Sequence, residues 1–337
     1  MLEKQRSLQY TPRQGGMTMK RIGILTSGGD SPGMNGALRA GVRAALSLGW
    51  EVIGIHRGYS GLINEEFQVM DSKSVSGILQ FGGTILQTAR SKEFFLEEGR
   101  RKAAGIVRKH GIDALVIIGG NGSLTGALKL HELGITTVGI PGSIDNDLYG
   151  TDMAIGVDTA LNTIVQAVDK IKDTASSHDR AFIIEVMGRE SGYLAVMSAM
   201  ASGAEFAIVP EVPYDIKAIS AKLRKRYEEK RSNSIIIVAE GATSGFQIEK
   251  ELRDEIGFET RVTVLGHVQR GGSPTVFDRL IASQFGYFAV DFLNKGGSGK
   301  MVGLIKDDIV FTPFEEAISK VKPIKKELIT IMEMLGT

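Results

Sequence analysis

The alternation of two kinds of segment constrains the fold of this chain more than any other feature. From Lys20 onward, short runs rich in β-branched residues alternate with amphipathic stretches of helical length. This alternation is typical of α/β proteins, in which helices cover both faces of parallel sheets. The pattern predicts strands at residues 22–26, 52–56, 114–118, 137–140, 182–186, 206–209, 234–239 and 262–266. It predicts helices at residues 35–48, 123–132, 159–174, 194–201, 216–229 and 275–294.

Length and composition exclude several classes of protein. The 337 residues suffice for about two domains, and because no flexible linker divides the chain, we expect the domains to interleave in sequence. The 40 Lys and Arg residues balance 39 Asp and Glu residues, so we expect neither a nucleic acid nor a membrane surface as partner. Cysteine is absent, which excludes disulfides, thiolate metal sites and a cysteine nucleophile, and fits a reducing compartment.

The start of the chain differs from the rest. Residues 1–19 show no apolar period and precede an abrupt strand-like run, so we expect a flexible N-terminal extension. This segment lacks the apolar centre of a signal peptide, and no apolar run in the chain is long enough to cross a membrane. We therefore expect a soluble, cytoplasmic protein.

Several predicted strands end in turns rich in glycine or Asx residues. Such turns occupy residues 27–30, 119–123 and 144–147. In parallel sheets, ligands bind beyond the carboxyl ends of the strands, so the turns are expected to converge on one site. Glycine lets phosphate oxygens approach main-chain N–H groups, and a following helix points its positive end at the same anion. Ordinary turn geometry is the alternative interpretation of either glycine turn.

Two carboxylates stand two residues apart in the last of these turns. Asp145 or Asp147 could accept a proton from a hydroxyl group, while the other orients a metal and a phosphate. The alternative is an Asx-turn, in which these side chains only bind nearby main-chain N–H groups.

Arginines recur at strand ends and loop entries. The guanidinium group is planar and permanently charged, which suits phosphate recognition, although scattered arginines are usually solvated. The candidates are Arg90, Arg180, Arg189, Arg261 and Arg270.

Taken in order, these motifs resemble those of the bacterial-type ATP-dependent 6-phosphofructokinases. The matching segments are Ser27-Gly28-Gly29-Asp30, Pro32-Gly33-Met34-Asn35, the turn of residues 119–123, Asp145-Asn146-Asp147, and residues 186–192 and 265–274. The resemblance implies two doubly wound, Rossmann-like domains with mainly parallel sheets, an active site in the cleft between them, and a homotetramer. It implies a nucleotide-binding domain at residues 20–155 plus about 268–320, and a sugar-phosphate-binding domain at residues 156–267 plus the C-terminal helix region, residues 321–337.

The resemblance also implies a reaction and its residues. The enzyme would be a glycolytic kinase that transfers the terminal phosphoryl group of MgATP to the 1-hydroxyl of fructose 6-phosphate. Asp145 would be the base, Asp147 would act near the magnesium, and Ser143 keeps the hydroxyl of the family's usual threonine. Arg189 completes the implied catalytic set. The residues implied to contact ATP are Gly29, Arg90, Ser91, Gly120, Asn121, Gly122 and Ser123. Those implied to hold fructose 6-phosphate are Ser143, Asp145, Met187, Gly188, Arg189, Glu240, His267 and Arg270, with Arg180 and Arg261 reaching the site from a neighbouring subunit.

Three positions bear on the donor and on activity. Gly122 and Gly142 match the ATP-using branch of the family, whereas the pyrophosphate-using branch carries Asp and Lys there. Asn121 replaces a usual Asp that helps to bind magnesium, and an amide gives up the negative charge, so metal affinity should fall. The alternatives are therefore a catalytically weak regulatory subunit and a pyrophosphate-dependent enzyme; a dinucleotide-binding oxidoreductase is more distant, because no G-x-G-x-x-G follows the first strand.

A second, effector site is implied as well. The family binds ADP or phosphoenolpyruvate between subunits, and Arg39, Arg43, Lys172 and Glu205 match its residue types, although Ser72 replaces a family arginine. The alternative for Arg39 and Arg43, four residues apart on a predicted helix, is a solvated basic face.

Overall fold

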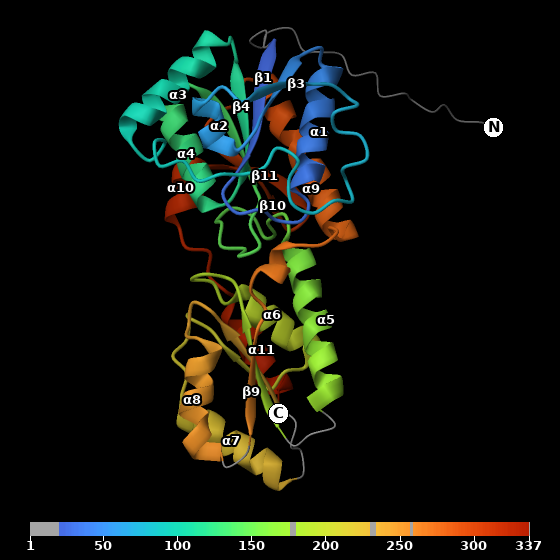
Figure 1. Ribbon diagram of the computed structural model, residues 1–337, viewed down its shortest axis with the longest axis vertical. Coiled ribbons are helices and arrows are strands. Elements are labelled where there is room, and N and C mark those ends of the chain that lie inside the picture. The colour runs from blue at the N-terminus through green and yellow to red at the C-terminus, as the bar shows by residue number, and fades with distance from the viewer. Residues whose placement is uncertain (1–19, 176–179, 230–233, 257–258, 337) are drawn as a thin grey trace, which may run out of the picture.

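The computed structural model describes residues 20–175, 180–229, 234–256 and 259–336. They form two lobes stacked along the long axis of the molecule, each built around its own β-sheet (Figure 1). We call the lobe with the seven-stranded sheet the first lobe and the lobe with the four-stranded sheet the second lobe. The predicted fold class, α/β with mainly parallel sheets in two domains, is confirmed.

The sheet of the first lobe brings the predicted turns together. Its strands are β1 (Arg21–Ser27), β2 (Glu51–Ile55), β3 (Phe67–Met70), β4 (Ala114–Gly119), β5 (Thr136–Pro141), β10 (Lys300–Ile305) and β11 (Asp308–Pro313). They run in the order β11-β10-β5-β4-β1-β2-β3, and only the edge strands β3 and β11 are antiparallel to their neighbours. The register sets Ser27, Gly119 and Pro141 side by side at the carboxyl ends of their strands. The two glycine turns and the carboxylate turn therefore begin at one edge of one sheet.

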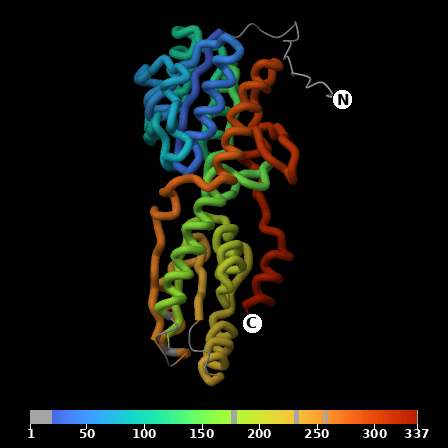
Figure 2. The backbone as a smooth tube through the Cα atoms, turned by 90° about the vertical axis from the view of Figure 1, so that its right-hand side faces the viewer, coloured from blue at the N-terminus to red at the C-terminus, as the bar shows by residue number. Residues whose placement is uncertain are grey.

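Helices cover both faces of this sheet. One face carries α1 (Met34–Ser47) and α9 (Val276–Asn294), which lie side by side in Figure 2. The other face carries α2 (Gly58–Ile63), α3 (Glu97–Lys109), α4 (Asn121–Glu132) and α10 (Phe314–Ser319). Helices α1 and α9 can approach closely because Gly286 has no side chain; a Cβ atom there would collide with the backbone oxygen of Ala37. Strand β4 is buried along its whole length, which explains its unbroken apolar sequence.

The second lobe repeats this layered plan on a smaller scale. Its parallel sheet has the order β7-β8-β6-β9, with β6 (Ala181–Val186), β7 (Phe206–Ile208), β8 (Ser234–Ala239) and β9 (Thr260–Val264). One face packs on α5 (Val157–Ala175), α6 (Tyr193–Ser202) and α11 (Lys326–Leu335). The other packs on α7 (Ile216–Glu228) and α8 (Gly245–Ile256).

The chain passes repeatedly between the lobes. It crosses between β5 and α5 in residues 142–156, between β9 and α9 through the 3-10 helix η1 (Gly266–Arg270), and between α10 and α11 in residues 320–325. Strands β10 and β11, late in the sequence, complete the first sheet, so the lobes interleave. The domain boundaries given above stay a prediction. Among the described residues, no helix combines the length and the apolar character needed to cross a membrane.

Some elements differ from the prediction. Gly266, predicted as the last residue of a strand, is the first residue of η1, because β9 ends at Val264. The alternation pattern also missed β3, β10 and β11, as well as α2, α3, α8 and α10, whereas α11 lies within the predicted C-terminal helix region. The edge strands β3 and β11 are mostly half-exposed or exposed, and polar residues interrupt or flank their short apolar stretches. The predicted extension, residues 1–19, lies outside the described residues.

Candidate active site

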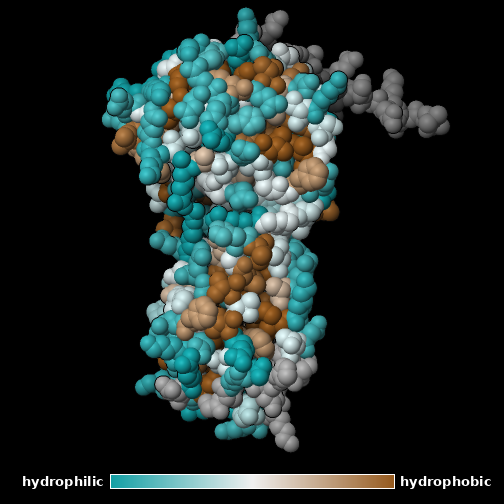
Figure 3. All heavy atoms as spheres, viewed as in Figure 1, coloured by the Kyte–Doolittle hydropathy of each residue, from teal (hydrophilic) through white to brown (hydrophobic). Residues whose placement is uncertain are grey.

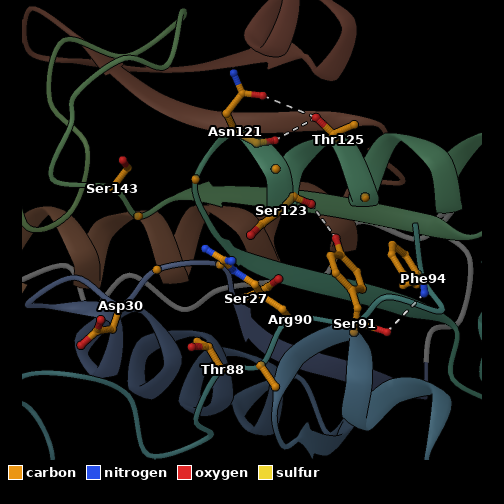
Figure 4. A pocket seen from close by; sticks show the side chains of 18 of the residues that line it. Ser27, Asp30, Thr88, Arg90, Ser91, Phe94, Asn121, Ser123, Thr125 and Ser143 are labelled. Carbon is orange, nitrogen blue, oxygen red and sulfur yellow. Dashed lines mark hydrogen bonds between the residues drawn. The ribbon is translucent and has the colours of Figure 1, made fainter. Parts of the chain in front are cut away.

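A cavity of about 660 Å³ opens at the carboxyl edge of the first sheet and extends to the second lobe. This volume is typical of small-molecule sites. Figure 4 shows Asn121 and Ser143 on one side of the cavity and Asp30 and Thr88 on the other, with Ser123 between them. The predicted site residues that line it are Gly29, Arg90, Ser91, Gly120, Asn121, Gly122, Ser123, Ser143, Asp145, Arg189 and Arg270.

The glycine turn between β4 and α4 forms a cradle whose open helix end suits an anion. Gly120 is the N-cap of α4 and supplies no side chain, so the positive end of this helix faces the cavity without a capping group. The Ser123 hydroxyl is buried and has no hydrogen-bond partner among the described residues. A Cβ atom at Gly122 would meet nothing within 4 Å, so a side chain there would project into open space. An anionic ligand in the cavity would therefore meet the uncapped N–H end of α4, beside the buried and unpaired hydroxyl of Ser123.

An aromatic wall borders this cradle, and sequence reasoning missed it. Tyr59 and Phe94 stack with their ring centroids 4.0 Å apart. The Tyr59 hydroxyl donates to the Ser123 carbonyl oxygen at 2.5 Å, and burial raises the pKa of this tyrosine. No motif marks these two aromatic residues, and Tyr59 lies on a helix of six residues that is too short for a periodic pattern.

The carboxylate turn follows β5. Asp145 is 3% exposed; its Oδ2 lies 3.2 Å from the Nε of Arg189, and its Oδ1 has no partner within the described part of the chain. Burial raises the pKa of Asp145, the charge of Asp147 raises it further, and Arg189 and Arg270 act in the opposite direction. Asp145 is thus a carboxylate of increased basicity with one oxygen free to accept a proton.

The second lobe presents Arg189 from the end of β6. Glu240 Oε1 accepts hydrogen bonds from the main-chain N–H groups of Gly188 at 3.3 Å and Arg189 at 3.0 Å. Gln269, a buried residue that sequence reasoning missed, accepts a hydrogen bond from the N–H of Met187 at 3.2 Å. These bonds hold the backbone that aims Arg189 at the carboxylate.

Helix η1 reaches across to the first lobe. A Cβ atom on Gly29 would lie 3.1 Å from Nη1 of Arg270, so this guanidinium group rests on the first glycine turn. His267, also in η1, is exposed and does not line the cavity. The predicted residues Asp147, Met187, Gly188 and Glu240 do not line the cavity.

Two other predicted site residues lie away from the cavity in this single chain. Arg180 and Arg261 both pair with Glu259, with 2.5 Å between Arg180 Nε and the carboxylate, at the opposite end of the second sheet from Arg189. Their predicted role in a neighbouring subunit therefore stays a prediction.

The predicted effector residues also lie in different lobes. Arg39 and Arg43 belong to α1 of the first lobe. In the second lobe, Lys172 donates to the carbonyl oxygen of Gly203 at 3.2 Å, and Glu205 pairs with Arg226 at 2.6 Å. One chain alone does not assemble this site.

A magnesium ion fits this cavity only if phosphate groups and waters supply most of its ligands. No group of three or more His, Asp or Glu side chains suited to a metal occurs in the described residues. Oδ1 of Asp147 is buried without a partner there, and the amide oxygen of Asn121 accepts only a 3.4 Å hydrogen bond from Thr125. Magnesium typically takes one or two protein oxygens together with phosphates and waters, which suits this sparse donor set.

Comparison with known proteins gives the family. Residues 21–293 match the family model described as phosphofructokinase. The chain is 53% identical to the ATP-dependent 6-phosphofructokinase of Thermotoga neapolitana, covering 94% of this chain and 100% of that protein. It is 50% identical to ATP-dependent 6-phosphofructokinase 2 of Bacteroides thetaiotaomicron, covering 95% and 99%. A solved phosphofructokinase from Saccharomyces cerevisiae is 38% identical with a TM-score of 0.84; the match covers 94% of this chain but only 47% of the yeast chain. The chain belongs to the phosphofructokinase family.

Proposed function

We propose that this chain transfers the terminal phosphoryl group of MgATP to the 1-hydroxyl of fructose 6-phosphate, giving fructose 1,6-bisphosphate and ADP in glycolysis. Relatives of about this length, 53% and 50% identical, carry the name of an ATP-dependent 6-phosphofructokinase. The observation that carries the proposal is Asp145: a buried carboxylate with one free oxygen, in a cavity that also holds an anion cradle.

Asp145 acts as the base on the sugar hydroxyl. Its raised pKa makes it a stronger proton acceptor than an exposed Asp. The nearby Arg189 acts against this shift by favouring the ionised form, and it can attract the oxygens of the transferred group. Phosphoryl transfer depends mostly on positioning and on neutralising charge, so cationic groups and main-chain donors should outnumber acid–base groups. The composition of this cavity agrees with that requirement.

The two substrates occupy opposite ends of the cavity in this proposal. The ATP phosphates lie on the cradle and near Arg90, with the base toward the aromatic wall of Tyr59 and Phe94. Fructose 6-phosphate lies toward the second lobe. The residues proposed to hold it are Ser143, Asp145, Met187, Gly188, Arg189, Glu240, His267 and Arg270.

Asp147 and Asn121 would hold magnesium. Its charge would neutralise the phosphate oxygens when it is bound with ATP. The amide at position 121 keeps an oxygen that can bind the metal but carries no charge. We therefore expect the protein itself to bind magnesium more weakly than it would with an Asp at this position.

A second copy of the chain completes the sugar-phosphate site in this proposal. Within the described residues, β9 pairs with β6 alone, which leaves an open edge that carries Arg261. Val264 on this strand is 47% exposed, and Figure 3 shows hydrophobic residues gathered over the second lobe between β9 and the waist. We propose a cytoplasmic homotetramer in which this face brings Arg180 and Arg261 to a neighbour's cavity.

The effector site belongs to the same assembly. Arg39 and Arg43 of one copy and Lys172 and Glu205 of another would meet at an interface and bind ADP or phosphoenolpyruvate. Their separation within one chain is consistent with this arrangement.

ATP is favoured over pyrophosphate as the donor by two glycines. A charged side chain at position 122 would project into the open cavity, and a Cβ atom at Gly142 would already lie 2.9 Å from Cε of Met34. A regulatory subunit with weak activity is the second candidate, and Asn121 is the observation that favours it.

A coupled assay with fructose 6-phosphate tests the proposal. Activity with ATP should exceed activity with pyrophosphate at every magnesium concentration, and Asp145→Asn should lower kcat by about 10²–10⁴-fold without a change in circular dichroism. Equal or higher activity with pyrophosphate would contradict the choice of donor. Nucleotide binding without turnover would favour the regulatory subunit.

A further inference from the structure

The carboxylate turn, residues 144–147, is called the catalytic turn from here on, and it has a central residue that the mechanism does not use. Asn146 lies between Asp145 and Asp147, is 1% exposed and has a positive φ of 52°. In this left-handed conformation the backbone leaves the course of a regular strand or helix, and this sets the directions of the two flanking carboxylates. The direction of both carboxylates therefore depends on what holds Asn146.

Both polar ends of the Asn146 side chain bind one short segment. Its Nδ2 donates to the carbonyl oxygen of Asp152 at 3.0 Å, and its Oδ1 accepts from the N–H of Ala154 at 3.1 Å. Asp152 is also tied to the first lobe, because its own N–H donates to the carbonyl oxygen of Leu304 at 2.7 Å. Hydrogen bonds thus link the catalytic turn to residues 152–154, and another links Asp152 to β10.

A lysine from a distant part of the chain binds the same carbonyl. Nζ of Lys322 donates to the carbonyl oxygen of Asp152 at 2.8 Å. Lys322 belongs to residues 320–325, which run down the side of the molecule from α10 to α11 in Figure 2. Its Nζ also lies 5.8 Å from the ring centroid of Tyr193, the first residue of α6. A carbonyl oxygen has two lone pairs, so Asn146 and Lys322 together saturate this one.

We propose that Lys322 is a positioning residue for the catalytic turn: through the shared carbonyl oxygen of Asp152 it holds Asn146, and with it Asp145, in the orientation that the reaction needs. The inference rests on the proposed function. A hydrogen bond from an ammonium group is stronger than one between neutral groups, so its loss loosens residues 152–154 more than the loss of a neutral bond would. Burial lowers the pKa of Lys322 to about 8, while the negative charges of Asp152 and Asp147 act in the opposite direction and favour the ammonium form.

The first measurement does not depend on catalysis. In Lys322→Met, amide hydrogen exchange in a peptide spanning residues 144–155 should become at least about tenfold faster than in the unaltered chain. Lys325→Met is the matched control, because it removes an exposed lysine from the same segment. Unchanged exchange in Lys322→Met, or an equal increase in Lys325→Met, would overturn the proposal whether or not the enzyme phosphorylates fructose 6-phosphate.

The second measurement separates positioning from general stability. Lys322→Met should lower kcat about tenfold and leave the KM for ATP within about twofold, because neither residues 152–154 nor residues 320–325 line the cavity. Lys322→Arg, which keeps a charged donor, should restore most of kcat. A loss of kcat that Arg does not restore, or an increase confined to KM, would refute a positioning role.

A double-mutant cycle tests the link between the two residues. Asn146→Gly suits the positive φ and removes the amide, so it keeps the backbone while cutting the same link. The combined variant should lose less kcat than the product of the two single losses, because both changes break one connection. Strictly multiplicative losses would show that Lys322 does not act through Asn146. If the unaltered chain turns over no fructose 6-phosphate while the exchange results hold, the proposed function fails and the structural link stands.

Discussion

Gly126 lies where the added methyl group of an alanine would press on the aromatic wall. It belongs to α4, and a Cβ atom built there lies 2.6 Å from Cε2 and 2.7 Å from Cζ of Tyr59. The Tyr59 ring cannot withdraw freely, because Phe94 stacks on it at 4.0 Å and its hydroxyl is bonded to the Ser123 carbonyl. Gly126→Ala should therefore displace the ring and disturb the cradle that the ring supports.

The magnitude follows from two opposing effects. Replacing a glycine by alanine inside a helix stabilises it by about 0.8–1.0 kcal/mol, whereas overpacking a buried site costs about 1–3 kcal/mol. Gly105 of α3 supplies the matched control, because it is exposed and a Cβ atom there would meet nothing within 4 Å. Gly105→Ala should show the stabilisation alone, so the two variants should differ by about 1–3 kcal/mol.

The assay compares thermal unfolding of the two variants at equal protein concentration, together with their KM for ATP. We expect Gly126→Ala to unfold at least about 2 °C below Gly105→Ala and to have a higher KM for ATP. Gly105→Ala should keep the KM of the unaltered chain. Equal unfolding temperatures and equal KM values would show that Tyr59 moves aside at no cost and would refute the packing argument.

Three further predictions concern charge in the cavity. The acid limb of the pH profile of kcat/KM should follow ionisation of Asp145. Asp147→Asn removes a charge that raises the pKa of Asp145, so it should move the limb to lower pH. Arg189→Gln removes a charge that lowers this pKa, so it should move the limb to higher pH. Shifts in the same direction would refute this assignment. Asn121→Asp should lower the magnesium concentration needed for half-maximal activity, and an unchanged titration would show that position 121 does not reach the metal. Gly122→Asp should fold normally and raise the KM for ATP at least about fivefold, since like charges about 4 Å apart cost about 1 kcal/mol even in water; a KM within twofold would place the phosphates elsewhere.

The sequence predicted the part of the site that follows from sheet topology. Ser27, Gly119 and Pro141 end parallel strands in register, so the turns that follow them had to meet once the strands were recognised. Residues on those turns, including Asn121 and Asp145, line the cavity as expected.

The rest of the site depends on packing that leaves no periodic signal. Tyr59 and Phe94 lie in a short helix and a loop, and only the folded chain brings them against α4. Gln269 is an uncharged residue whose role becomes visible only through its bond to the backbone of Met187. Arg180 and Arg261 illustrate a different limit. The family resemblance assigns them to the site, but in the single chain both pair with Glu259 instead.

The way the chain crosses between the lobes explains why the site depends on both of them. Residues 142–156 carry Asp145, η1 carries Arg270, and residues 320–325 carry Lys322, so each crossing holds a group that contacts the cavity or its supporting turn. Arg189 approaches from the end of β6 in the second lobe, whereas Asp145 follows β5 of the first lobe, and only 3.2 Å separates their charged groups. A change in the angle between the lobes would alter this distance directly. The strength of Asp145 as a base is therefore coupled to the placement of the second lobe, because Arg189 lowers its pKa only while the two groups stay close.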